Sequence, residues 1–405
     1  MSTVTPADWQ TRPAPRTAEE WIARAAEVAA VLATDAAARD RAGATPHAEV
    51  RLLKDAGLVT LLGPAEHGGA GQDWTTAYRV VREVAKADGS IGQLLGYHYL
   101  WNWAARLVGT REQWERIEAE AARERWFFGG AVNPRDKDVV VTEDGDDLVF
   151  SGRKSFSTGS RVSDVTVLEG VLEGTENHVF AIVPSGTAGL TFHDDWDNIG
   201  QRLTESGSVT IDGVRTPWSS ALGYVGKEFQ PRTYATLNVP TIQLVFVAFY
   251  LGIAGGALET AATYTRTKSR SWLHGGYERA VDEPYVIDTY GDLTAKLWAV
   301  EALADAVAAE GQKLHDDPDA VTEQARGEFE VRVAAVKARA TDVALEVANR
   351  VFEVTGARAT STAEGLDRFW RNIRTHSLHD PVAYKRREVG RWVLEGELPQ
   401  PTWYS

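Results

Sequence analysis

Apolar residues recur at helical spacing through the first third of the chain. The interval of three or four positions is typical of helices that bury one face. The stretches with this pattern are residues 19–42, 47–56, 74–86 and 91–108. Gly57 stands where the second stretch ends, and glycine is common just after the end of a helix. We therefore predict a helical N-terminal domain over residues 1–125.

The pattern changes near Trp126 to short apolar runs divided by turn residues. The strand-like runs are residues 139–142, 148–151, 165–172, 178–183, 190–193 and 208–212. Residues 143–146 read Glu-Asp-Gly-Asp, a composition that favours a hairpin between the first two runs. Short strands at close intervals indicate a compact β-barrel or sandwich over residues 126–233.

The last part of the chain, residues 234–405, returns to helical periodicity. The long periodic stretches cover residues 239–269, 284–315, 319–354 and 380–395. Long helices with short connections favour an antiparallel bundle. The most apolar stretch, 239–257, contains Gln243 and three glycines, so we predict a buried core helix there rather than a membrane span. The order α, β, α predicts an α+β fold that is mostly α.

Composition excludes several classes of function. The net charge is −14, from 57 acidic and 43 basic residues, which disfavours binding to nucleic acid and to anionic membranes. The chain has no cysteine, so it can form neither disulfides nor thiolate metal sites. Residues 1–16 show no apolar signal segment. We expect a cytoplasmic protein.

Three segments carry a resemblance to a known family. They are AGLVTLLGPAEHGGAG at 56–71, FEVTGAR at 352–358 and DRFWRNIRTHSLHDP at 367–381. With the α–β–α order, they resemble the acyl-CoA dehydrogenase superfamily. The resemblance implies a helical N-terminal domain, a middle β-domain and a C-terminal four-helix bundle that together enclose a flavin. Within the superfamily, the chain looks most like the flavin-dependent monooxygenases, and among those like the dibenzothiophene monooxygenases.

The segment 376–381 decides between the branches of this superfamily. A dehydrogenase needs a carboxylate as general base, commonly a glutamate in the loop after the glycine turn. Here that stretch offers His376 and His379 but no glutamate. Asp380 precedes Pro381 and is expected to cap the next helix. Imidazole instead suits hydrogen bonding to a peroxide and proton transfer at neutral pH.

The resemblance implies a two-component reaction. A separate flavin reductase would supply FMNH2, and oxygen would then form a C4a-hydroperoxyflavin that oxygenates a small hydrophobic, aromatic substrate. S-oxygenation of a dibenzothiophene-like thioether is the nearest analogue. FAD in place of FMN stays possible, and a homotetramer is expected by analogy. The substrate, and whether sulfur, nitrogen or carbon is oxygenated, stay open.

The resemblance also suggests roles for individual residues. His98, Thr158 and His379 would be the catalytic residues that hold the peroxide. For His98 the alternative is a core histidine with both nitrogens satisfied. The cofactor would be bound by residues of the middle domain and of the bundle: Phe156, Ser157, Thr158, Trp196, Arg270, Gly356, Arg358 and His376. Arg270 and Arg358 would bind the FMN phosphate, with Arg358 supplied by a neighbouring subunit.

Other interpretations stay open at this point. An FAD-dependent acyl-CoA dehydrogenase would need a base such as Glu259 or Glu364. An N- or C-hydroxylating monooxygenase of the same fold is another alternative, and a scaffold without activity is a third. The pair His376 and His379 could mark a metal site, but no further ligand is apparent and we expect none. Gly130 departs from the related pattern, which carries an asparagine there. Substitutions around Phe127 and at residues 101–103, Trp-Asn-Trp, also predict a differently shaped substrate pocket.

Overall fold

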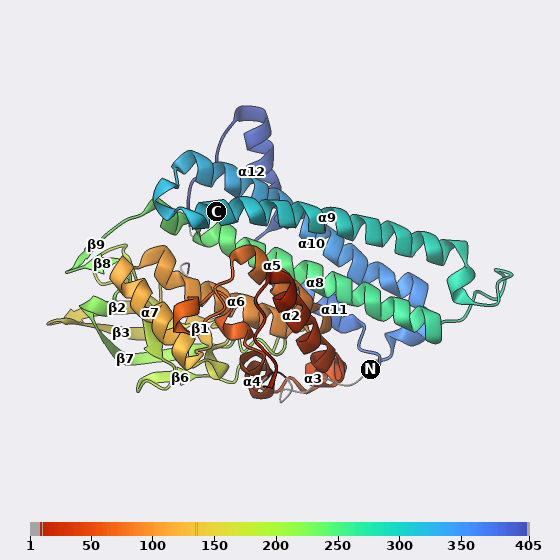
Figure 1. The fold of residues 1–405 in the computed structure, drawn as a ribbon, viewed down its shortest axis with the longest axis horizontal. Helices are drawn as coiled ribbons and strands as arrows, with labels where there is room; N and C mark the ends of the chain where they lie inside the picture. The colour runs from red at the N-terminus through yellow and green to blue at the C-terminus, as the bar shows by residue number, and fades with distance from the viewer. Residues whose placement is uncertain (1–8, 10, 134, 136, 403–405) are drawn as a thin grey trace.

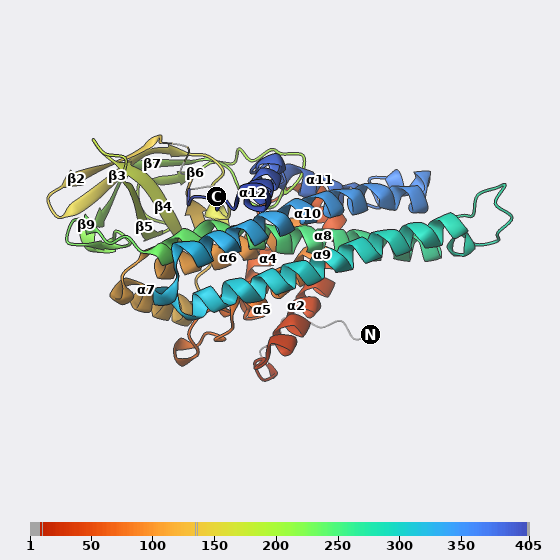
Figure 2. The same cartoon turned by 90° about the horizontal axis from the view of Figure 1, so that it is seen from above.

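The computed structural model describes residue 9 and residues 11–133, 135 and 137–402. Helices come first, a mixed sheet follows, and long helices complete the chain (Figure 1). The predicted α–β–α order and the mostly helical fold class are thereby confirmed. The sheet lies at one end of the molecule, and the long helices extend away from it (Figure 2).

The N-terminal helices follow the sequence pattern with two differences. The predicted helix 19–42 is broken at Asp35, whose φ of −137° and ψ of 12° are not helical. The second difference is an additional helix, α7, which begins with a capping box formed by Thr110 and Gln113. The helices are α2 (Ala18–Ala33), α3 (Ala36–Ala42), α4 (His47–Asp55), α5 (Trp74–Ala87), α6 (Gly89–Val108) and α7 (Arg111–Glu124).

The middle strands form one seven-stranded sheet and one hairpin. The strands are β1 (Phe128–Ala131), β2 (Val139–Asp144), β3 (Asp147–Lys154), β4 (Val165–Leu172), β5 (His178–Pro184), β6 (Leu190–Phe192), β7 (Val209–Pro217), β8 (Tyr224–Val225) and β9 (Glu228–Phe229). The order is β1-β4-β2-β3-β7-β6, with β5 on the other edge of β4, and β8 pairs with β9. The predicted β2–β3 hairpin is present, with Asp144 opposite Asp147. The sheet packs around an apolar core of its own.

The C-terminal helices are α8 (Asn238–Thr267), α9 (Pro284–Asp316), α10 (Glu323–Thr355), α11 (Asp367–His376) and α12 (Val382–Glu395). Helix α11 was not predicted, since the sequence analysis treated its last residues as a loop. The expectation that Asp380 caps α12 was wrong, because the N-cap is Pro381 and no side chain bonds there.

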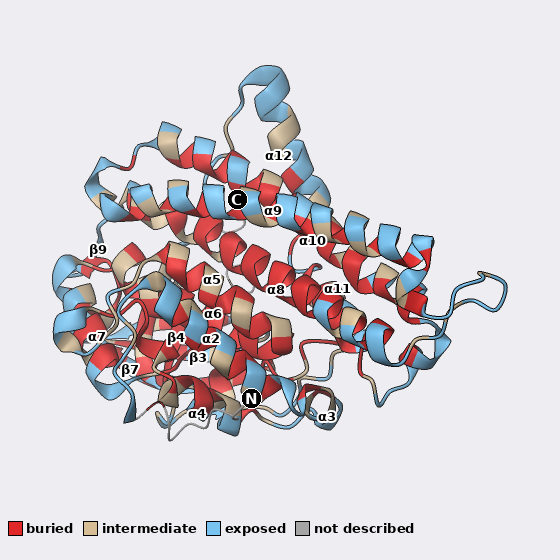
Figure 3. Ribbon diagram, turned by 45° about the vertical axis from the view of Figure 1, so that its right-hand side comes forward, coloured by how far each residue is buried: buried red, intermediate tan, exposed pale blue. Residues whose placement is uncertain are grey.

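Helix α8 occupies the middle of the molecule, between α5 and α6 on one side and α9 and α10 on the other (Figures 1 and 3). It is the one helix of the described residues long and apolar enough to span a membrane, yet 94% of its most apolar window is buried by other elements. The prediction of a core helix is thus confirmed. Its glycines allow this packing: a Cβ at Gly252 or Gly256 would lie 2.3 Å from the carbonyl oxygen of Arg82 or 1.9 Å from that of Lys86.

Candidate active site

A cavity of about 1060 Å³ lies between α6, the middle sheet, the N-terminal half of α8 and residues 374–380. One part of its wall is mostly apolar and reaches the β8–β9 hairpin, although Asn238, Gln243 and His178 also line the cavity. The residues of this part include Leu100, Ala104, Val108, Leu222, Tyr224, Phe229 and Val239. Such a chamber favours a ligand that is itself apolar, because burial of apolar surface is the main source of its binding free energy.

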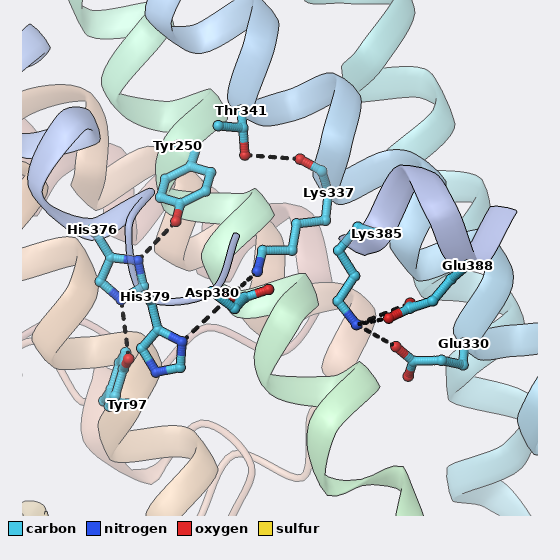
Figure 4. Close-up of polar contacts among 10 residues, drawn as sticks. All are labelled: Tyr97, Tyr250, Glu330, Lys337, Thr341, His376, His379, Asp380, Lys385 and Glu388. Carbon is cyan, nitrogen blue, oxygen red and sulfur yellow. Dashed lines mark hydrogen bonds and ion pairs between the residues drawn. The ribbon is translucent and has the colours of Figure 1, made fainter. Parts of the chain in front are cut away.

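His379 lies in the cavity wall, just after α11 (Figure 4). Its Nδ1 is 3.3 Å from Oδ1 of Asp380, and its ring stacks at 5.5 Å on that of His376. The ammonium group of Lys337, from α10, donates to the same Oδ1 of Asp380. The buried carboxylate therefore joins a lysine inside the bundle to a histidine of the cavity wall.

The state of Asp380 fixes the state of its neighbour. Burial alone would raise the pKa of Asp380, but the hydrogen bond from His379 and the charge of Lys337 outweigh it and hold that pKa well below its usual range. An ionised carboxylate can only accept hydrogen bonds. Nδ1 of His379 therefore carries a proton, and Nε2 is the basic nitrogen of the neutral ring.

His376 also lies in the wall, but both of its nitrogens are bonded to tyrosines. Nε2 is 3.0 Å from the hydroxyl of Tyr97, and Nδ1 is 2.8 Å from that of Tyr250. Burial, and after it the neighbouring His379 and Lys337, lower the pKa of His376 well below its ordinary value. A neutral ring donates at one nitrogen and accepts at the other, so it satisfies both tyrosines. This arrangement suits a rigid wall residue more than a proton carrier.

Thr158 ends a chain of buried hydroxyl groups. Its Oγ1 is 2.9 Å from Oγ of Ser206, which is 2.7 Å from Oγ1 of Thr204. Thr204 donates to the carbonyl of Gln201 at 2.9 Å. Because this first donor direction is fixed, Ser206 donates to Thr204 and Thr158 donates to Ser206. Thr158, which lines the cavity, thus offers an oxygen lone pair as a hydrogen-bond acceptor.

The segment around Phe156 is strained at the cavity. Phe156 has a φ of 58°, which is uncommon for a bulky residue, and the residue is 62% exposed. It meets Trp196 edge to face at 6.1 Å, and both rings line the cavity. Ser157 is fully buried and is not among the described residues that line the cavity. Its Oγ has no partner among the described residues, so cofactor binding through the backbone or the hydroxyl group of Ser157 stays a prediction.

Gln201 is a candidate that the sequence analysis missed. It is buried, lines the cavity, and has a φ of 53°. Its backbone N–H donates to Asn372 of α11 at 2.7 Å, yet neither polar atom of its side-chain amide has a partner among the described residues. An unpaired buried amide costs free energy unless a ligand satisfies it. This amide and the acceptor oxygen of Thr158 fit the polar edge of a flavin.

His98 does not face the cavity, so that expectation was wrong. Its Nε2 donates to the carbonyl of Val59 at 2.7 Å, and its Nδ1 accepts from the N–H of Phe128 at 3.0 Å. The ring stacks on Phe127 at 4.8 Å. His98 joins α6 to β1 and to the segment before the glycine-rich turn. It is a core histidine, which was the alternative interpretation.

Acid should destabilise the fold through its buried histidines. Burial lowers the pKa of His98 to about 4 and that of His315 to about 3, against about 6.5 in an unfolded chain. Below pH 6.5 these imidazoles bind protons in the unfolded chain but not in the folded one. The free energy of unfolding therefore decreases as the pH is lowered towards the pKa of the folded state. Each histidine should cost about 1.4 kcal/mol per pH unit in that window. Urea unfolding at pH 7, 6 and 5 measures this slope, which a His98→Gln variant should reduce; an unchanged slope contradicts the assignment.

Arg270 and Arg358 stand on two segments that are joined by hydrogen bonds, and neither segment lines the cavity. Arg358 donates to the carbonyl of Lys268, and Ser269 donates to that of Thr355 at 3.0 Å. Both arginines are exposed, and the glycine between the helix and this turn, Gly356, has a φ of 82°. The C-terminal ends of α8 and α10 stand at the end of the bundle opposite the sheet (Figure 2). Neither arginine lines the cavity of its own chain.

Gly130 and Trp101 explain the departure from the family pattern. A Cβ at position 130 would lie 2.4 Å from Cε2 of Trp101, so the indole occupies the space that a side chain there would take. Trp101 lines the cavity, as expected. Trp103 instead packs outside it, with its Nε1 donating to Tyr234 at 3.2 Å, and Phe127 packs on His98.

The carboxylates considered for a dehydrogenase are misplaced. Glu364 pairs with Lys268 at 2.7 Å, and Glu259 is largely exposed. Neither lines the cavity, whereas Asp380, which does, is already engaged by Lys337. Among the described residues there is also no cluster of three or more histidine, aspartate or glutamate side chains that could hold a metal.

Comparison with known proteins agrees with this geometry. The model of the acyl-CoA dehydrogenase N-terminal domain matches residues 17–125, and that of the C-terminal domain matches residues 244–383. A dibenzothiophene monooxygenase of Rhodococcus erythropolis is 41% identical over 402 residues, which cover 96% of this chain and 94% of the relative.

Two solved structures extend the likeness. The methanesulfinate monooxygenase MsuC of Pseudomonas fluorescens superposes with a TM-score of 0.92 at 39% identity, covering 95% of this chain and 99% of the other. FMN-bound TdsC of Paenibacillus sp. A11-2 superposes with a TM-score of 0.90 at 40% identity, covering 95% and 100%. The chain therefore belongs to the flavin-dependent monooxygenases of the acyl-CoA dehydrogenase superfamily.

Proposed function

We propose that this FMN-dependent monooxygenase transfers one oxygen atom to the sulfur of a small aromatic thioether. The observation that carries the proposal is the apolar chamber between α6 and the β8–β9 hairpin, which opens onto the wall that contains His379. A planar aromatic substrate buries its surface there. Methanesulfinate, the substrate in the name of one similar enzyme, is far smaller and would leave most of this apolar wall without contacts.

Bound reduced FMN supplies two electrons and activates oxygen, and the protein supplies the environment. Apolar walls exclude water, which keeps the activated oxygen from being lost as hydrogen peroxide. Thr158 accepts a hydrogen bond at its Oγ1, and the amide of Gln201 meets polar atoms of the flavin. His379 gives and takes a proton at Nε2. One oxygen atom goes to sulfur, and the other leaves as water.

The proposal includes a separate reductase that supplies FMNH2, a cytoplasmic location and a homotetramer. The position of Arg270 and Arg358, both exposed and outside the cavity wall of their own chain, supports the tetramer. In it, Arg358 of the partner subunit would reach the phosphate of the flavin bound by the first subunit. A guanidinium pair suits that group, because it gives bidentate, charge-assisted hydrogen bonds.

The substrate is tested with reduced FMN and isotopically labelled oxygen. The enzyme is loaded with photoreduced FMN without oxygen and mixed with ¹⁸O₂ buffer that contains dibenzothiophene, methanesulfinate or indole. We expect mass spectrometry to find the sulfoxide of dibenzothiophene with one labelled oxygen. If only methanesulfinate or only indole is oxygenated, the aromatic thioether is the wrong substrate class. If hydrogen peroxide is the sole product in all three mixtures, the proposal is overturned.

A further inference from the structure

We propose that Lys337 is a positioning residue of the oxygenation reaction: from inside the bundle, it acts through Asp380 to fix the tautomer of His379. The inference rests on the role of His379 in the proposed function. Figure 4 shows the three side chains in sequence, from α10 to the cavity wall. Lys337 itself touches neither the cavity nor its contents.

The burial of Lys337 is the first observation. Lys337 is 2% exposed. Its ammonium group donates to Asp380 and lies 5.4 Å from the centre of the Phe246 ring. Removing a lysine ammonium from water costs several kcal/mol, and a buried ion pair is weak evidence for stability on its own. Apolar residues in place of a buried ion pair are often neutral or stabilising, so stability alone is a weak explanation for this pair.

The geometry of Asp380 supplies the second observation. A single oxygen, Oδ1, accepts from both Lys337 and His379, while Oδ2 has no partner among the described residues. Asp380 is buried, so without the lysine its carboxylate would tend to take up a proton. A protonated carboxyl can donate as well as accept, and Nδ1 of His379 would no longer have to carry a proton.

The surroundings leave this role to Lys337. His376 stacks on His379, but its own nitrogens are held by two tyrosines. Lys385, the other buried lysine nearby, is bonded to Glu330 and Glu388 instead of Asp380 (Figure 4). The titratable and charged groups around the His379–Asp380 pair are Lys337, His376, Tyr97, Tyr250, Arg374, Lys385, Glu330 and Glu388.

The test variants are Lys337→Met, Asp380→Asn and the double variant that combines these two substitutions. Lys337→Arg, which keeps the positive charge, is the conservative variant. A matched control, Glu330→Gln with Lys385→Met, removes the other buried lysine and its carboxylate from the same bundle. Two quantities are measured. The first is the tautomer of His379 in flavin-free protein, read from ¹⁵N shifts of labelled histidine by magic-angle-spinning NMR and assigned with a His379→Gln sample. The second is the fraction of consumed oxygen that ends in product.

In the wild type we expect a single Nδ1–H tautomer of His379. Lys337→Met should mix the tautomers and lower the fraction of oxygen in product by about 10-fold or more, as loss of a supporting partner does at other sites. The double variant should lower the fraction of oxygen in product no more than either single variant does. All three variants interrupt the same chain of contacts from Lys337 through Asp380 to His379. Lys337→Arg and the control pair should keep the wild-type tautomer and coupling.

Two results would overturn the inference. One is a folded Lys337→Met enzyme with the wild-type tautomer and coupling. If that variant does not fold, the charge-neutral double variant takes its place, and wild-type coupling there has the same consequence. The tautomer is measured without flavin or substrate. A wild type that forms no sulfoxide but shows the lysine-dependent tautomer would therefore refute the proposed substrate while leaving the inference in place.

Discussion

Replacing His379 by alanine should lower product formation by about 100-fold or more while flavin binding stays within a few-fold of wild type. A positioned general acid–base group contributes about 10² to 10⁴ in rate, and no other imidazole of the described cavity wall is bonded to Asp380. His376 cannot replace it, because both of its nitrogens are bonded to tyrosines. Oxygen should still be consumed and should appear as hydrogen peroxide.

The measurement compares sulfoxide and hydrogen peroxide formed per FMNH2, with flavin affinity determined by fluorescence titration. His193→Ala is the matched control, since His193 bonds Thr210 at 2.9 Å outside the cavity wall. It should leave both quantities unchanged. Wild-type coupling in His379→Ala would remove His379 from the mechanism, and a loss of flavin affinity in proportion to activity would reassign it to cofactor binding.

Replacing Lys385 by methionine should lower the stability of the fold substantially. Its ammonium is 3.0 Å from Oε1 of Glu330 and 3.0 Å from Oε2 of Glu388, and both Lys385 and Glu330 are buried. Removing one partner of a buried pair costs about 3–5 kcal/mol. Arg326, 3.8 Å from the other oxygen of Glu330, keeps part of that charge compensated, so we expect the lower end of this range. Since this contact attaches α12 to α10, hydrogen exchange should rise most strongly in α12.

Urea unfolding of the wild type and the variant measures the loss. Arg332→Met is the control on the same helix, because its pair with Glu310 is equally close at 2.8 Å but half exposed, and such pairs contribute about 1 kcal/mol or less. Adding Glu330→Gln to Lys385→Met should restore much of the stability. A loss in Lys385→Met no greater than in Arg332→Met would show that the buried pair does not attach α12.

The helices and strands that the sequence predicted show clear periodicity over long stretches, whereas β1 and α11, which it missed, are short. Strand β1 reads Phe-Gly-Gly-Ala, without the β-branched residues typical of strands, and it is held in the sheet by parallel pairing with β4. Helix α11 is only ten residues long, and four of them are charged. The spacing of Phe369 and Ile373, both buried, was the signal that could have indicated it.

At the site, the sequence indicated residues that chemistry or family resemblance singles out, such as His379 and Thr158. It could not indicate Lys337, because a lysine on a long helix is normally exposed and its partner lies 43 positions later. Gln201 was missed because its left-handed backbone depends on the surrounding structure. His98 was misplaced for a related reason: a sequence does not show on which side of its helix the partners of an imidazole lie.

The close approach of Gly130 and Trp101 has a consequence for redesign of substrate range. With 2.4 Å between the indole and the position of a Cβ, the two residues share one volume and cannot be varied independently. A library that randomises position 130 alone would return mostly defective proteins, and one that shrinks only position 101 would leave a void above a bare backbone. Larger aromatic substrates should be sought by exchanging both residues together, so that the volume removed from one side of the contact is refilled from the other.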